Sequence, residues 1–91
     1  MGERAKHIVF TGRVQGVGFR FTAFHIANRC QLSGWVRNCT NGDVEMVVQG
    51  RPDNIDDCIG DIQKSFAEYI RETKIEEVPP DPKYEDFKIT F

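Results

Sequence analysis

The middle of the chain decides the fold, where residues 34 to 48 read Gly-Trp-Val-Arg-Asn-Cys-Thr-Asn-Gly-Asp-Val-Glu-Met-Val-Val. The first part of this run, residues 34–39, is typical of a strand, and Val44, Met46 and Val48 alternate as a half-buried strand does. Asn41-Gly42 between them is a strong hairpin signal, because both residues tolerate positive φ. The stretch therefore predicts an antiparallel hairpin.

A helix is predicted on either side of this hairpin. The apolar residues of the first helix fall on one face and are Phe19, Ala23, Ile26, Ala27 and Cys30. After Gly50, Pro52 can begin a second helix, since its missing N–H is no loss in the first turn. The apolar stripe of this second helix comprises Ile55, Cys58, Ile59, Ile62, Phe66, Tyr69 and Ile70. Acidic residues near its start suit the helix dipole and need no metal ion to explain them.

Before the first helix, residues 7–13 read as a strand. After the second helix, residues 74–78 read as a short additional strand and 79–82 as a loop, and a last strand is indicated by the alternation of Phe87, Ile89 and Phe91. The order β-α-β-β-α-β with an additional strand predicts one domain over residues 1–91. Its class is an α+β, ferredoxin-like split βαβ sandwich with an antiparallel sheet and two helices on one face. Which of the last two segments pairs with the first strand stays open.

Composition narrows the possible partners and location. Twelve basic against fourteen acidic residues give a net charge of −2, without the basic footprint of a nucleic-acid binder. No apolar run approaches the roughly 18 residues of a membrane span, and the first residues lack a signal peptide's apolar stretch. Cys30, Cys39 and Cys58 are odd in number without metal-type spacing. We expect a cytoplasmic protein with reduced thiols and no membrane partner.

The segment that carries chemistry is residues 12 to 20, Gly-Arg-Val-Gln-Gly-Val-Gly-Phe-Arg, between the first strand and the first helix. A turn there directs successive backbone N–H groups into one concavity, and the helix start adds partial positive charge. Gly16 and Gly18 allow an anion to approach closely, and the Arg20 guanidinium fits two phosphate oxygens. This predicts a phosphate cradle; the alternative is a glycine-rich turn with a surface arginine. Neither the P-loop nor the dinucleotide fingerprint fits the run.

Two runs together resemble the paired signature of the acylphosphatase family. The first is Gly12-x-Val14-Gln15-Gly16-Val17-x-Phe19-Arg20, and the second is Gly34-Trp35-Val36-Arg37-Asn38-x-x-x-Gly42-x-Val44, followed by Gly50. The resemblance is close over residues 12–50, and beyond them only the order of elements agrees. One departure is Gln31, just after the first helix, where the family usually carries glycine. If the helix ends near Cys30, Gln31 occupies the position at which helices often turn left-handed.

The resemblance implies hydrolysis of the carboxyl-phosphate bond of a small acyl phosphate to a carboxylate and inorganic phosphate. It implies that Arg20 holds the phosphoryl group and that Asn38 orients the attacking water. The phosphate oxygens would lie on the backbone of Gln15, Gly16, Val17, Gly18 and Phe19. We expect a monomer, and no metal or cofactor, because no ligand cluster for a catalytic metal is visible.

The remaining reactive side chains are predicted to take no part in the chemistry. His7 and His25 read as structural or surface residues, and Cys39 as a bystander beside Asn38. Trp35 is expected in the sheet, with contact to an acyl group as the alternative. Three rival functions remain: an RNA-recognition module, a module of a larger carbamoyl transferase of hydrogenase maturation, and an inactive anion-binding relative. The first is disfavoured because residues 43–48 contain no aromatic side chain.

Overall fold

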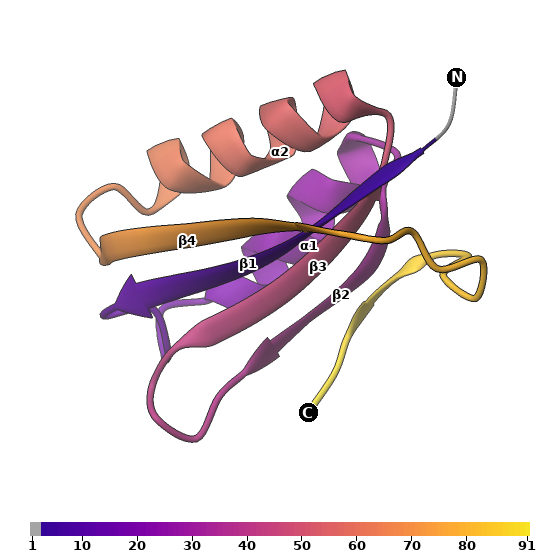
Figure 1. The fold of residues 1–91 in the computed structure, drawn as a ribbon. Coiled ribbons are helices and arrows are strands. Elements are labelled where there is room, and N and C mark those ends of the chain that lie inside the picture. The colour runs from indigo at the N-terminus through magenta and orange to yellow at the C-terminus, as the bar shows by residue number, and fades with distance from the viewer. Residues whose placement is uncertain (1–2) are drawn as a thin grey trace.

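The computed structural model describes residues 3–91, which form five strands and two helices (Figure 1). In chain order the elements are β1 (Arg4–Gly12), α1 (Phe19–Arg29), β2 (Ser33–Asn38), β3 (Val44–Gly50), α2 (Pro52–Ser65), β4 (Ile70–Val78) and β5 (Phe87–Ile89). The predicted order with its additional strand is confirmed. Within the described residues, neither helix has the length and apolar character needed to cross a membrane.

The five strands form one sheet in the order β4-β1-β3-β2-β5. β1 pairs antiparallel with both β3 and β4, and β2 and β3 form the predicted antiparallel hairpin. Both helices cover the same face of this sheet (Figure 1), with α1 packed against β2 and β5 and α2 against β1 and β3. The molecule is therefore the predicted ferredoxin-like α+β sandwich, and the segment that pairs with β1 is β4.

One edge of the sheet corrects the prediction of a wholly antiparallel sheet. β5 pairs with β2 in parallel, with Gly34 opposite Phe87 and Val36 opposite Ile89. The parallel direction of β5 is set by the segment between β4 and β5, which crosses the end of the sheet. Gln49 of β3 fixes this connection, since its Nε2 donates to the Asp81 carbonyl at 2.9 Å and its Oε1 accepts from the Asp81 N–H at 2.7 Å. Local strand patterns in the sequence do not predict the path of such a connection.

The end of α2 differs from the predicted stripe, which continued to Ile70. The helix ends at Ser65, and the N–H groups of Tyr69 and Ile70 both donate to the Phe66 carbonyl at 2.9 Å in a turn. Phe66 nevertheless stays buried. The apolar stripe in the sequence therefore continues past the end of the helix, because the turn also faces the core. β4 then begins at Ile70, earlier than the predicted residue 74. The sequence does not reveal this start, because β4 is a mostly exposed edge strand without a clear alternation of apolar and polar residues.

An aromatic cluster joins the elements beneath the β1–α1 loop. The ring of Phe19, the first residue of α1, lies 4.9 Å from the Phe10 ring of β1 and 4.5 Å from the Phe66 ring, measured between centroids. All three side chains are buried in the single core, and aromatic pairs at these distances attract each other. The first turn of α1, and with it the loop before it, is therefore held firmly against the sheet.

The end of α1 shows why Gln31 is unusual. Its backbone is left-handed, with φ 60°, and it is the one non-glycine residue with positive φ in residues 3–91. The Gln31 N–H donates to the Asn28 carbonyl at 3.0 Å, and the Leu32 N–H donates to the Ala27 carbonyl at 3.0 Å. This is the Schellman pattern, and Leu32 joins Ala27 in the core, the hydrophobic contact that often accompanies this motif. The predicted left-handed conformation of Gln31 is confirmed.

Candidate active site

The loop of residues 13–18 leaves β1 and turns into α1 with an unusual backbone. The Arg13 N–H donates to the Tyr69 carbonyl at 2.8 Å and fixes its start. Gly16 and Gly18 have φ angles of 77° and 78°, in the left-handed region that glycine adopts without steric cost. A methyl group added to either glycine would meet no protein atom within 4 Å. Glycine is thus needed here for the backbone conformation, and the space outside it is open.

The backbone N–H groups of this loop form a run of free donors. Within residues 3–91, no N–H of residues 14–21 donates to a protein acceptor, and the α1 ladder starts with the Thr22 N–H on the Gly18 carbonyl at 3.1 Å. Gly18 caps α1 without a side-chain hydrogen bond, and no acidic residue lies in the first turn. The helix dipole and these donors together leave a local positive potential that an anion would neutralise.

Two polar side chains from separate elements meet at this loop. Arg20 lies in the first turn of α1 and Asn38 at the last position of β2, and both are half-buried. They line one cavity of about 270 Å³ together with Gly16, Gly18 and Phe19. The structure thus brings together five of the predicted site residues around a space large enough for a phosphoryl group.

The other two predicted loop residues face elsewhere with their side chains. The Gln15 side chain reaches the β2–β3 turn, where its Nε2 donates to the Cys39 carbonyl at 2.7 Å and to the Asp43 carbonyl at 2.9 Å. Val17 packs against the core. Their backbone N–H groups have no protein acceptor and are the parts of these two residues that an anion could reach. The Gln15 amide also ties the loop to the segment that directly follows Asn38.

Apolar residues complete the cavity, and they are absent from the predicted site. They are Val14, Phe21, Ile89 and Phe91. The Arg20 guanidinium carbon lies 5.1 Å from the centroid of the Phe91 ring, within the range of a cation–π contact. Alternation in the sequence marked Phe91 as a strand residue, but its approach to Arg20 depends on the parallel pairing of β5 with β2.

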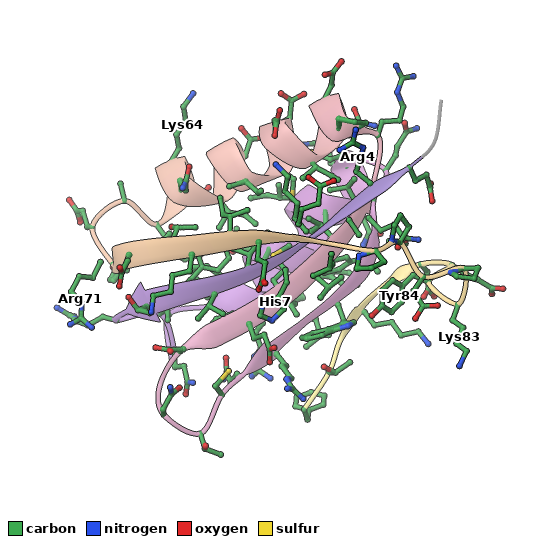
Figure 2. All side chains as sticks on the ribbon, viewed as in Figure 1. Arg4, His7, Lys64, Arg71, Lys83 and Tyr84 are labelled. Carbon is green, nitrogen blue, oxygen red and sulfur yellow. The ribbon has the colours of Figure 1, made fainter. Side chains whose placement is uncertain are left out.

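Neither histidine side chain is part of the cavity lining. The Nε2 atom of His7 lies 2.6 Å from a carboxylate oxygen of Glu45, and Figure 2 shows His7 over the middle of the sheet. The His25 ring is exposed on α1 and meets the Phe21 ring edge to face, with centroids 4.5 Å apart. Neither histidine lines the cavity, and neither is placed to move a proton there.

Cys39 and Trp35 do not line the cavity either. Burial and the nearby Glu45 carboxylate raise the pKa of the Cys39 thiol, so it stays protonated at neutral pH and is a poor nucleophile. Cys39 and the other two cysteines are free thiols. The Trp35 Nε1 donates to the Tyr84 hydroxyl at 3.2 Å, and Trp35 does not line the cavity. Figure 2 places Tyr84 in the loop before β5, at the opposite end of that strand from the cavity.

Among residues 3–91, no three His, Cys, Asp or Glu side chains gather as metal ligands would. The independence from metal stays a prediction. The positively polarised loop, Arg20 and Asn38 together can bind a small tetrahedral anion and orient a water molecule beside it.

The fold and this cavity define a class, namely a small ferredoxin-like α+β domain with a glycine-rich candidate anion site at the start of its first helix. The acylphosphatase family model matches residues 6–89. An acylphosphatase of Chlorobaculum tepidum is 36% identical, and the alignment covers 98% of this chain and 98% of that one.

Solved structures agree with that match. The crystal structure of acylphosphatase from Bacillus subtilis superimposes with a TM-score of 0.88 at 25% identity, covering 97% of this chain and 99% of that chain. Full-length HypF contains a similar region, with a TM-score of 0.83 and 33% identity over 98% of this chain but 12% of HypF. The chain therefore belongs to the acylphosphatase family, and the predicted acylphosphatase enzyme is confirmed.

Proposed function

We propose that this enzyme hydrolyses small acyl phosphates in the cavity between the β1–α1 loop and the end of β2. The observation that carries the proposal is the run of free N–H donors at residues 14–21, at the same cavity as the side chains of Arg20 and Asn38. In this proposal the loop N–H groups and the Arg20 guanidinium bind the phosphoryl oxygens. Asn38 holds the attacking water, since its amide offers both a donor and an acceptor.

The reaction needs few catalytic groups. The water oxygen bonds to phosphorus as the bond from phosphorus to the acyl oxygen breaks, and the carboxylate leaves with that electron pair. Its conjugate acid has a pKa of about 4, so it departs without a general acid. The proton lost by the water passes to a phosphate oxygen. Because this transition state is loose, positioning and charge stabilisation by the loop and Arg20 are sufficient.

We infer that the enzyme works as a cytoplasmic monomer without a nucleic-acid partner. Three free thiols favour a reducing compartment. Among the described residues only three large apolar side chains are exposed, which is too few for an extensive dimer interface. The net charge of −2 offers no basic footprint for RNA. Sedimentation at micromolar concentration tests the monomer.

The assignment of Asn38 is tested with benzoyl phosphate in buffer containing EDTA. Asn38→Ala is expected to lower kcat about 100-fold, which is the scale of removing one hydrogen-bonding group that acts in the transition state. Inorganic phosphate should still raise the melting temperature of this variant nearly as much as that of the wild type, because the loop and Arg20 remain. Asn28→Ala, at an exposed asparagine of α1, is the control.

Collapse of phosphate protection in Asn38→Ala would show that the roles are misassigned. Loss of wild-type turnover in EDTA, restored by a divalent ion, would contradict the metal-free mechanism. Turnover by the isolated chain also distinguishes an enzyme that works alone from one that works only within a larger protein such as HypF.

A further inference from the structure

The cavity has an apolar side that phosphate binding does not explain. Phe21 and Phe91 are 64% and 97% exposed, and they are two of the three exposed large apolar residues in the described chain. Both line the cavity that holds Arg20 and Asn38, whereas the third, Ile75, lies on the edge strand β4. Exposed aromatic side chains that gather at one cavity are typical of a ligand contact rather than of scattered surface residues.

Each of the two aromatic rings contacts a neighbouring side chain and still exposes most of its surface. The Phe21 ring packs edge to face on His25, with centroids 4.5 Å apart and the planes at 83°. The Phe91 ring lies over the guanidinium of Arg20 at 5.1 Å. The Thr90 N–H donates to the Val36 carbonyl at 2.9 Å, so residues 87–91 run alongside β2 toward its end (Figure 1). The last residue of β2 is Asn38. Phe21 thus lies on the same helix as Arg20, and Phe91 follows the strand that pairs with the strand of Asn38.

The geometry of an acyl phosphate brings its acyl group to this surface. The acyl carbon is joined to phosphorus through a single oxygen, so its substituent must lie beside the bound phosphoryl group. A phosphoryl group with the volume of a few water molecules, at ~30 Å³ each, fills only part of a cavity of about 270 Å³. The remainder is bordered by Phe21, Ile89 and Phe91.

The neighbouring charge does not favour a second anionic group on the substrate. Arg37, which borders the adjoining hollow beside Asn38, already forms a salt bridge with Glu45 at 2.7 Å. We propose that Phe21, Ile89 and Phe91 form an acyl subsite, which selects acyl phosphates with an aromatic or other apolar acyl group. This inference rests on the proposed function and adds the substrate class.

The test compares kcat/KM for benzoyl phosphate and acetyl phosphate in the wild type, Phe21→Ala, Phe91→Ala and the double variant. The benzoyl-to-acetyl ratio is expected to fall about tenfold in the double variant, the scale of discrimination that a small hydrophobic pocket provides. Phe21→Ala is the cleaner single variant, because Phe91 also touches Arg20. Ile75→Ala, an exposed apolar residue outside the cavity, should leave the ratio unchanged.

A second test of the acyl subsite measures binding of phosphonates without turnover. Benzylphosphonate should protect the wild type against thermal unfolding more than methylphosphonate does, and the double variant should lose this difference. Equal losses on both substrates, or an unchanged preference for benzylphosphonate, would overturn the acyl subsite while leaving the hydrolase intact. A wild type that releases phosphate from neither substrate would instead overturn the proposed function and this inference with it.

Discussion

At the scale of single residues, a left-handed backbone occurs both after α1, at Gln31, and before it, at Gly16 and Gly18. The left-handed turn at Gln31 follows from the position of the helix end and is confirmed by its φ of 60°. The glycines at 16 and 18 likewise have the positive φ that the cradle needs. By contrast, the approach of Phe91 to Arg20 joins residues far apart in the chain, and no local pattern contains it.

Gln31→Gly is expected to stabilise the protein. A side chain with a Cβ is strained at φ 60°, and a glycine there is not, although glycine increases the entropy of the unfolded chain. The Gln31 side chain is exposed and makes no hydrogen bond within residues 3–91, so little stability depends on it. We expect about 0.5–1 kcal/mol, or roughly 2–8 °C in melting temperature.

Melting curves of Gln31→Gly and the wild type, measured together with turnover, check this expectation. Turnover should not change, since Gln31 lies at the opposite end of α1 from Arg20. Gln31→Ala is the matched control, because it shortens the side chain but keeps the Cβ. A melting temperature that falls in the glycine variant would show that the left-handed strain is not what limits stability here.

At the scale of elements, the hairpin and both helices are predictable because their signals are local. Asn41-Gly42 and the apolar stripes identify each of them without knowledge of the rest of the chain. The pairing of β5 is not predictable, because it depends on the path of residues 79–86 and its bonds to Gln49. The same is true of the link from the β1–α1 loop to the β2–β3 turn through Gln15.

Gln15→Ala tests that link as a positioning contact. Its amide holds the turn that follows Asn38, so its removal should let Asn38 shift while every loop N–H group remains. We expect kcat to fall about tenfold with a small change in KM, since small misplacements of a catalytic group cost this much or more. Phosphate protection against unfolding should persist.

Gln63→Ala, at an exposed glutamine of α2, serves as the control for this variant. A merely structural role for Gln15 would lower the melting temperature and leave kcat per folded molecule unchanged. That outcome would contradict its role in positioning Asn38.

At the scale of the whole molecule, the face of the sheet without helices carries a charged network that should make stability depend on pH. The hydrogen bond with His7 and those from Arg37 lower the pKa of Glu45 from its usual 4.5, against the opposing effect of burial. A carboxyl group with a lowered pKa contributes stability above its unfolded pKa, and this is lost as pH falls through the folded pKa.

The free energy of unfolding of the wild type should therefore decrease as pH falls from about 5 to below 4. Glu45→Gln should be less stable at pH 7 by about 1 kcal/mol, the usual net contribution of such hydrogen bonds, and should lose less across that acid interval. Glu85→Gln, at an exposed carboxylate of the loop before β5, is the control. Parallel pH curves for the wild type and Glu45→Gln would contradict this account.

The central claim is that Arg20 binds the phosphoryl group in the β1–α1 loop, and one measurement tests it most directly. Turnover of benzoyl phosphate is compared between the wild type and Arg20→Lys, which keeps the charge but loses the planar two-pronged donor geometry. The account predicts a loss of about 100-fold in kcat/KM with an unchanged melting temperature. Turnover near that of the wild type would contradict it and place the phosphoryl group elsewhere.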